Sequence, residues 1–231
     1  MIIDTESDQF AAFRISNRAI FPGSTINTPT AFGARLGQVY GGISYQRRTR
    51  YSDRQDAIFA AGAGFGNARK WIGLDLTLTS LDTYTDLGED WSLSVKIHRS
   101  LPRRSAVAIG YENIWHTDGT DGGSSAYGVF SKIFQLLSES VGIVNDRFLS
   151  EDAFRRNEEG INVFGNLGVR LHPSLNAIAN WTGQDLGIGI SISPFPQFPV
   201  IITPALMDVV GTAGDGARFS VGIALLHDFR R

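Results

Sequence analysis

The sequence contains no cysteine, and this absence removes several classes of function at once. Among its 231 residues there is no thiol to form a disulfide, to bind a metal as thiolate or to act as a nucleophile. An excess of charge of one sign is missing too, since 21 Lys and Arg stand against 23 Asp and Glu, a net charge of −2. Nucleic-acid binding, which requires a strongly basic face, therefore has no support.

Long hydrophobic runs are also missing. No stretch approaches the roughly 18 apolar residues that a membrane-spanning helix needs, so such a helix is excluded. The first residues, MIIDTESDQF, have neither the basic nor the apolar region of a signal peptide. We therefore expect either a cytosolic protein or a chain whose leader was removed and whose Met1 was added. Membrane-spanning strands stay compatible with this composition, because their alternating residues average to neutral hydropathy.

What the sequence does contain is alternation with a period of two. In WSLSVKIH, residues 91–98, Trp, Leu, Val and Ile fall on one side of an extended chain, and Ser, Ser, Lys and His fall on the other. The same alternation recurs at 71–80, 106–115, 161–172, 186–193 and 219–229. Less regular strands are expected at about 31–46, 56–66, 124–136, 141–149, 175–183 and 199–210. This makes about twelve strands of roughly ten residues, the length of a tilted strand that crosses a bilayer.

The connections between these strands alternate between short and long. Short links are expected at 67–70, 101–105, 137–140 and 172–174, and longer polar ones at 46–56, 81–90, 116–125 and 150–160. Within 150–160 a short helix capped by Ser150 is predicted. Short turns at one end and longer loops at the other are typical of outer-membrane barrels.

The composition of the two strand faces indicates which face contacts lipid and which lines the interior. A soluble sandwich would carry Lys, Glu and Arg on its polar face, whereas here that face is rich in Gly, Ala, Ser and Asn, as the interior of a narrow barrel requires. We therefore predict an all-β, antiparallel, up-and-down transmembrane β-barrel of about twelve strands. The alternative is a soluble all-β protein that binds a ligand or a partner. An aromatic girdle at the two membrane interfaces is predicted at Trp71, Trp91, Trp115 and Trp181.

The last strand carries a resemblance to a known class. The closing RFSVGIALLHDF, together with the alternation, short turns and aromatic strand ends, resembles bacterial outer-membrane β-barrels of the porin-like kind over about residues 31–229. The resemblance implies that Phe229 is the terminal aromatic signal for the outer-membrane assembly machinery, although Arg230 and Arg231 follow it. The stretch from Ala31 to Asn67 also looks like uncharacterised cyanobacterial-type envelope proteins.

Charged and imidazole side chains on the polar face are candidates to line the lumen. They are Arg35, Asp75, Lys96, His98, Glu112, Lys132, Arg170 and His172. If the lumen is open, such residues set charge selectivity; if it is plugged, they bond to one another. The turn at 172–174 predicts that Arg170 lies near Asn176 and Asn166 near Asn180, and the turn at 101–105 predicts Lys96 within diagonal reach of Glu112.

Other sites have weaker support. Asp118 and Asp121 in a glycine-rich loop lack the spacing of a calcium loop. GAGFG, residues 62–66, is followed by a strand rather than a helix, so close packing or lumen space explains it better than dinucleotide binding. Ser94 and His98 lie two pleats apart, too far for a catalytic pair. The histidines show no metal-ligand spacing, and no cofactor is expected.

We therefore expect residues 1–30 to form an N-terminal tail, a plug or an extra strand, and residues 31–231 to form the barrel. The expected location is the bacterial outer membrane, with a signal peptide removed. The expected function is passive diffusion of small polar solutes or a structural role in the envelope, without enzymatic activity. Membrane lipid is the expected partner, and an outer-membrane lipid hydrolase is a further alternative.

Overall fold

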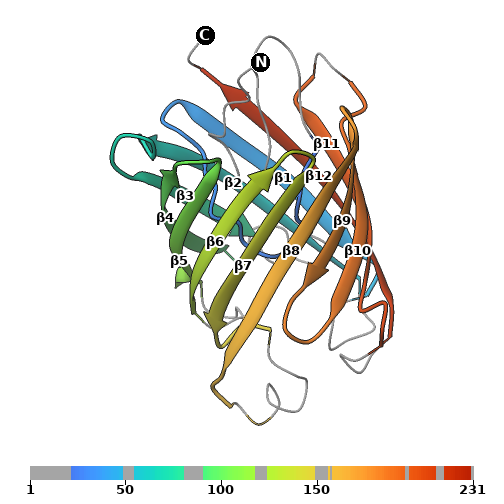
Figure 1. The fold of residues 1–231 in the computed structure, drawn as a ribbon. Helices are drawn as coiled ribbons and strands as arrows, with labels where there is room; N and C mark the ends of the chain where they lie inside the picture. The colour runs from blue at the N-terminus through green and yellow to red at the C-terminus, as the bar shows by residue number, and fades with distance from the viewer. Residues whose placement is uncertain are drawn as a thin grey trace.

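The chain folds into a closed barrel of twelve antiparallel strands (Figure 1). This computed structural model describes residues 22–48, 55–80, 91–117, 124–148, 156, 158–195, 198–211 and 216–229. Every strand pairs with its neighbours in sequence, and β1 closes the ring against β12. The strands are β1 Gln38–Gln46, β2 Asp56–Gly66, β3 Gly73–Ser80, β4 Trp91–Leu101, β5 Ser105–His116, β6 Ser125–Phe134, β7 Leu137–Asn145, β8 Ile161–His172, β9 Leu175–Trp181, β10 Leu186–Ile192, β11 Val200–Met207 and β12 Arg218–Asp228. The predicted up-and-down barrel is confirmed.

Two strand boundaries differ from the prediction. The first strand begins at Gln38, because residues 31–37 run inside the barrel instead of in its wall. The turn expected at 137–140 lies two residues earlier, where Gln135 adopts a left-handed φ of 51° in a two-residue hairpin turn. LSES is therefore the start of β7, with Ser138 and Ser140 facing inward. Glutamine is not a usual residue at such a turn, so no local pattern indicates the turn at this position.

The apolar rows face away from the barrel interior. Ile109, Val141 and Ile143 are each more than half exposed, whereas Ser131 and Asn180 on the opposite face are fully buried. Soluble monomers rarely leave contiguous apolar patches of more than a few hundred Å² in water. A barrel whose outer surface is apolar therefore requires the hydrocarbon of a bilayer around it, as outer-membrane barrels do. Among the described residues, no helix is long and apolar enough to span a membrane.

The two rims of the barrel differ in their connections. The links 67–72, 102–104, 135–136 and 173–174, together with the longer link 193–199, the start of β1 and the end of β12, lie at the rim that is uppermost in Figure 1. Most connections at the other rim are longer, as predicted, although 182–185 is short. We call these the short-turn rim and the long-loop rim.

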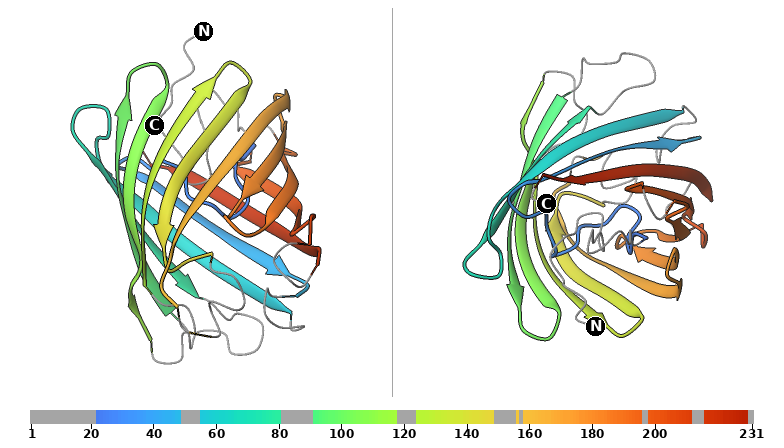
Figure 2. Two further views of the ribbon diagram at one scale, coloured as in Figure 1. Left: turned by 60° about the horizontal axis from the view of Figure 1, so that its bottom comes forward. Right: turned by 90° about the horizontal axis from the view of Figure 1, so that it is seen from above.

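A segment from Pro22 to Leu36 runs through the barrel interior. Thr30 and Ala31 are fully buried there, and Figure 2 shows this part of the chain inside the ring of strands when the barrel is viewed from above. Phe32 packs with inward side chains of β5, β6 and β8, including Tyr127 and Phe164. The wall therefore starts later than residue 31. Residues 1–21 lie outside the described residues, so a tail, a plug or an extra strand stays a prediction for them.

Candidate functional site in the barrel interior

A buried charge cluster holds the middle of the internal segment. Asp75 and Lys96 stand directly opposite each other on β3 and β4, and Lys96 Nζ lies 3.0 Å from Asp75 Oδ2. His98 Nε2 lies 3.5 Å from Asp75 Oδ1. The same Lys96 Nζ donates a hydrogen bond of 2.6 Å to the carbonyl oxygen of Phe32. A buried charge needs a partner and further hydrogen bonds, and here the internal segment supplies one of them.

Asn180 is the main anchor of the first half of the segment. Its Oδ1 accepts hydrogen bonds from Thr25 Oγ1 at 3.1 Å, from the Ile26 N–H at 3.3 Å and from Thr28 Oγ1 at 2.8 Å. Its Nδ2 donates to Asn27 Oδ1 at 2.8 Å. One side chain of β9 therefore satisfies polar groups of four consecutive residues, which fixes this stretch as a turn against the wall.

Further polar side chains of the wall bind the backbone of the segment. Asn176 Nδ2 donates to the Gly23 carbonyl at 2.9 Å, and Ser191 Oγ accepts from the Gly23 N–H at 2.8 Å. Ser131 Oγ accepts from the Ala31 N–H at 2.7 Å. The Asn and Ser residues of the polar strand faces therefore supply hydrogen-bond partners for the backbone of an irregular segment, which has no strand neighbour to bond with.

Glycines bring the segment close to the wall. A Cβ on Gly64 would lie 2.4 Å from the backbone of Ala34, and Leu36 forms an isolated bridge to Gly64. On the other side, a Cβ on Gly33 would lie 2.5 Å from the ring of His98. The interpretation of the glycines in 62–66 as close packing is confirmed, with the internal segment as the neighbour of Gly64 and the Tyr40 side chain as the neighbour of Gly62.

Ion pairs also mark the two ends of the interior. Arg35, at the end of the segment, lies 2.5 Å from Asp228 Oδ2 near the short-turn rim. Arg218 lies 2.8 Å from Asp185 Oδ2 near the long-loop rim, with both side chains buried. The sequence signalled Arg35 but not Arg218 or its partner, because a single Arg at a strand end carries no spacing pattern.

Glu112 lies where the remaining space in the interior is found. A cavity of about 260 Å³ between the segment and β1, β2, β11 and β12 is lined by Thr25, Ser44, Thr203, Glu112 and Arg147 among others. A second cavity of about 150 Å³ is lined by residues of β3 to β6, including Lys96 and again Glu112. Both cavities border Glu112, which connects the two sides of the interior.

Arg147 forms an ion pair with Glu112 of β5, a strand two places away from β7 in the wall. It follows β7, and its own carbonyl accepts a hydrogen bond of 3.1 Å from Asn162 Nδ2. Its guanidinium lies 4.6 Å from the ring centroid of Phe148, which in turn packs edge-on against Phe164. These contacts aim Arg147 inward and place one positive and one negative group at the boundary of the two cavities. The sequence did not single out Arg147, since it lies in a polar loop.

Of the predicted lumen residues, Arg170 faces the interior but Lys132 does not. Arg170 is half-buried on the inward face of β8, opposite Asn176 as the turn predicted, and Asn166 lies opposite Asn180. Lys132 is exposed on the outward face of β6, because Tyr127 and its alternate neighbours take the inward positions. Both faces of this strand mix polar and apolar residues, so alternation alone gave the wrong side.

His172 also lies away from the interior. It is exposed at the end of β8, and its Nδ1 is 2.9 Å from Ser174 Oγ in the turn that follows. The pairing register shifts between Arg170 and His172, so the alternation that placed His172 on the inward face ends there. Asp75, Lys96, His98 and Glu112 by contrast point inward, and Lys96 lies opposite Gly110, two residues from Glu112.

The four tryptophans lie near the rims at outward or exposed positions. Trp71 is 74% exposed in the turn before β3, at the short-turn rim. Trp91, Trp115 and Trp181 lie at the ends of β4, β5 and β9 at the long-loop rim. This is the arrangement of an interfacial girdle, while contact with lipid stays a prediction.

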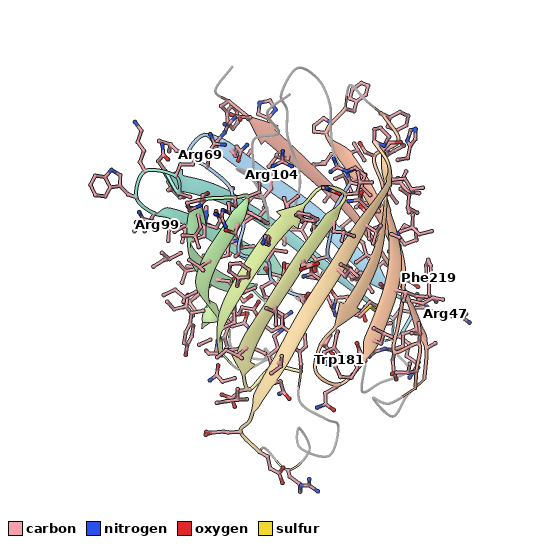
Figure 3. All side chains as sticks on the ribbon, in the orientation of Figure 1. Arg47, Arg69, Arg99, Arg104, Trp181 and Phe219 are labelled. Atoms are coloured by element: carbon pink, nitrogen blue, oxygen red, sulfur yellow. The ribbon has the colours of Figure 1, made fainter. Side chains whose placement is uncertain are left out.

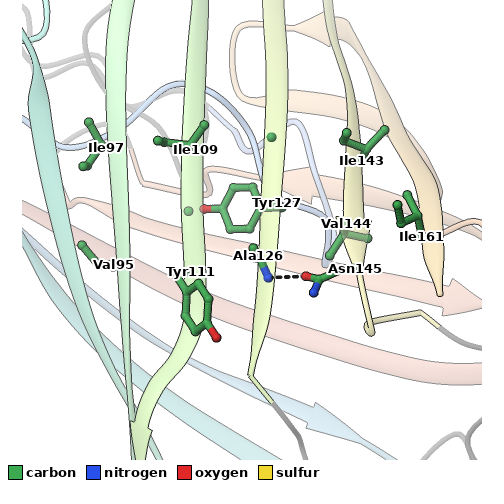
Figure 4. Close-up of a pocket in the computed structure, with 12 residues that line it drawn as sticks. Val95, Ile97, Ile109, Tyr111, Ala126, Tyr127, Ile143, Val144, Asn145 and Ile161 are labelled. Carbon is green, nitrogen blue, oxygen red and sulfur yellow. Dashed lines mark hydrogen bonds between the residues drawn. The ribbon is translucent and has the colours of Figure 1, made fainter. Parts of the chain in front are cut away.

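The outer wall has a hollow of its own. On the outward face of β6, Ala126 and Gly128 leave a groove of about 460 Å³ between the exposed isoleucines of β4–β5 and those of β7–β8 (Figure 4). Its lining is apolar apart from the edge, where the Ala126 N–H donates to Asn145 Oδ1. Such a lining suits hydrocarbon rather than a polar solute.

The residues weighed for catalysis or metal binding do not form such a site in the described part of the chain. Ser94 Oγ accepts the Asn113 N–H at 3.1 Å, at an irregularity between β4 and β5, and it stands two pleats from His98. Asp118, Asp121 and most of 150–160, where a short helix was predicted, lie outside the described residues. Within the described part of the chain, no group of three or more His, Asp or Glu side chains could hold a metal ion.

The fold is similar to that of a solved bacterial protein. The matching structure is the crystal structure of an outer membrane channel from Pseudomonas putida F1, with a TM-score of 0.50 and 8% sequence identity, and the match covers 87% of this chain and 100% of that one. No protein-family model and no curated protein matches the sequence. The predicted likeness to cyanobacterial envelope proteins finds no support in these comparisons. At this identity the match concerns the fold, and together with the outward apolar rows it shows that this chain has the fold of a bacterial outer-membrane β-barrel.

Proposed function

We propose that this protein is an outer-membrane channel through which small polar solutes diffuse passively. The observation that carries the proposal is the pair of cavities that meet at Glu112, beside the internal segment. The likeness to a solved outer membrane channel supports it. A location in the bacterial outer membrane follows from the outward apolar wall and is part of the proposal, as is the removal of a signal peptide.

The size and lining of the cavities indicate the class of solute. Volumes of about 260 and 150 Å³ hold several waters each, since one water occupies about 30 Å³. Thr77, Thr79 and Ser94 offer hydroxyl groups along the smaller cavity. Small solutes that exchange hydrogen bonds with hydroxyls and water fit this space, whereas bulky or apolar ones do not.

A second candidate function is a structural role in the envelope. The observation that favours it is the number of hydrogen bonds that hold the internal segment to Asn176, Asn180, Ser131 and Lys96. In that case the segment stays in place and the interior does not conduct. A catalytic role is not part of the proposal.

Conductance of the full chain in planar bilayers tests the proposal. We expect small discrete channels, and we expect Glu112→Gln to shift the reversal potential toward anion selectivity, because Arg147 then loses its counter-charge. The matched control is Glu139→Gln, which neutralises an exposed carboxylate on the outward face of β7 and should leave selectivity unchanged. Absence of any conductance above the bare bilayer would favour the structural role.

We further propose that the final strand engages the outer-membrane assembly machinery. Phe229 follows β12 directly and is 68% exposed, so its ring is available to a partner before or after folding. The N–H of Phe229 donates to the Gly37 carbonyl at 2.9 Å, which ties it to the closing seam between β12 and β1.

A further inference from the structure

A group of cations gathers on the outside of the short-turn rim between β2 and β6. We call Arg69, Lys70, Arg99, Arg103, Arg104 and Lys132 the basic rim. Figure 3 shows Arg69, Arg99 and Arg104 together at this edge of the barrel, far from Arg47. These residues come from two turns and two strands, and the pairing of consecutive strands brings them together.

Hydrogen bonds between the turns and strands fix their proximity. The Ser100 N–H donates to the Ala68 carbonyl at 3.0 Å, which places Arg99 beside the turn that carries Arg69. The Ile133 N–H donates to the Arg104 carbonyl at 2.9 Å, which places Lys132 beside the next turn. The basic rim is therefore continuous across β2 to β6.

Negative charge is scarce at this place. Among the described residues of β2 to β7 at this rim, Glu139 is the acidic side chain on the outer surface, where it stands opposite Lys132. Asp75 belongs to the same strands but is buried inside the barrel with Lys96. Among these described residues, the outer surface at this rim carries six cations against one carboxylate, so its local charge is strongly positive.

The basic rim lies where the apolar belt ends. Arg99 follows Ile97 on the outward face of β4, and Lys132 follows Phe130 on that of β6. Trp71 and Phe134, both mostly exposed, lie at the same level. Aromatic and long basic side chains collect in this way at the headgroup level, where the aliphatic stems lie in hydrocarbon and the charges reach the phosphates.

We infer that the basic rim binds the headgroups of anionic phospholipids in the leaflet that surrounds the short-turn rim. The charge of the patch, its position at the edge of the apolar wall and its aromatic neighbours point to a lipid phosphate, since a soluble anion would gain nothing from the adjoining apolar surface. The inference rests on the membrane location within the proposed function, but not on solute passage.

Native mass spectrometry of the full chain in detergent tests it with phosphatidylglycerol and phosphatidylcholine as probes. We expect preferential retention of phosphatidylglycerol, lowered about fivefold by Arg99→Gln and on the order of a hundredfold by the triple change Arg99→Gln, Arg104→Gln and Lys132→Gln. The matched control removes three cations at the long-loop rim, through Arg47→Gln, Arg48→Gln and Arg156→Gln, and should retain the lipid. Equal retention of both lipids, or no loss in the triple variant, overturns the inference.

A second measurement needs no change to the cations. Phosphatidylglycerol brominated on its acyl chains should quench the fluorescence of Trp71 more than brominated phosphatidylcholine does, with Trp71→Phe giving the contribution of this residue. Equal quenching by the two lipids contradicts the inference. If inorganic phosphate alone displaces the lipid fully, the rim binds phosphate without a membrane and the assignment to lipid is also overturned. Lipid preference without conductance leaves this inference standing while the proposed channel fails.

Discussion

At the scale of single residues, the interior is held together by charges that have partners. Lys96 is 2% exposed and touches both Asp75 and the carbonyl of Phe32. Such a pair contributes little net stability, yet removing one member leaves a buried charge without compensation. The same residue joins the wall to the internal segment, so its loss acts on both.

Lys96→Met should therefore destabilise the barrel strongly. We expect a loss of about 3–5 kcal/mol in the free energy of unfolding, because the Asp75 carboxylate stays buried without its cation. Guanidinium unfolding of the detergent-solubilised chain, followed by tryptophan fluorescence, measures it. The double change Asp75→Asn with Lys96→Met should recover much of the loss. If Lys96→Met unfolds at the same concentration as the wild type, the pair carries no such coupling.

At the scale of elements, the internal segment decides how much of the interior is open. Its contacts with β9 and β10 hold the first half against one side, and the cavities lie along β1 to β6 and β11 to β12. Gly64 and Gly33 allow the second half of the segment to approach the wall closely. The width of the passage therefore depends on side-chain anchors that are individually weak, each net hydrogen bond being worth about 1 kcal/mol.

Asn180→Ala should loosen the segment without unfolding the barrel. The change removes hydrogen-bond partners of Thr25, Ile26, Asn27 and Thr28 together. Since the chain has no cysteine, a single Ile26→Cys reports on the segment through its rate of labelling by a water-soluble thiol reagent. We expect faster labelling and a larger conductance in the Asn180→Ala background. Asn145→Ala, which alters an amide outside the interior, should change neither; equal rates in all three backgrounds would mean that Asn180 is not an anchor.

At the scale of the whole molecule, stability and location follow from one arrangement. Every strand has two neighbours, so no edge is left unpaired, and the apolar rows cover the outside. A closed barrel satisfies its backbone groups internally, which is the condition for crossing hydrocarbon. Such a molecule needs detergent or lipid to stay in solution, because its outer surface is apolar and aggregates in water.

Assembly of the barrel should depend on Phe229. We expect the folded chain to migrate faster than the heated chain on a gel. If the final strand is the recognition signal, the seam between β12 and β1 closes last. Phe229→Ala should then lower the folded fraction in bacterial membranes severalfold. The control is Phe219→Ala, an outward aromatic of the same strand that is 45% exposed. An equal folded fraction in both variants and the wild type would remove the assembly role of Phe229.

The sequence by itself determined the features that depend on residues close together in the chain, namely the strands and their two faces. Alternation with period two placed nearly every strand and told its two faces apart, because side-chain direction in a strand is local. The turn at 172–174 also fixed the register that sets Asn166 opposite Asn180. Local pattern failed for Lys132 and His172, where mixed faces and a register shift break the alternation.

Only the tertiary structure decided which distant residues meet. Asp75 and Lys96 were both candidates, but their pairing needed the register of β3 against β4 across a long connection. The enclosed path of residues 22–36 requires the ring to be closed, whereas the contact of Arg147 with Glu112 and the continuity of the basic rim depend on the registers of consecutive strands. Closure brings chain segments together at a fixed distance whatever their separation in sequence, and no local pattern contains that information.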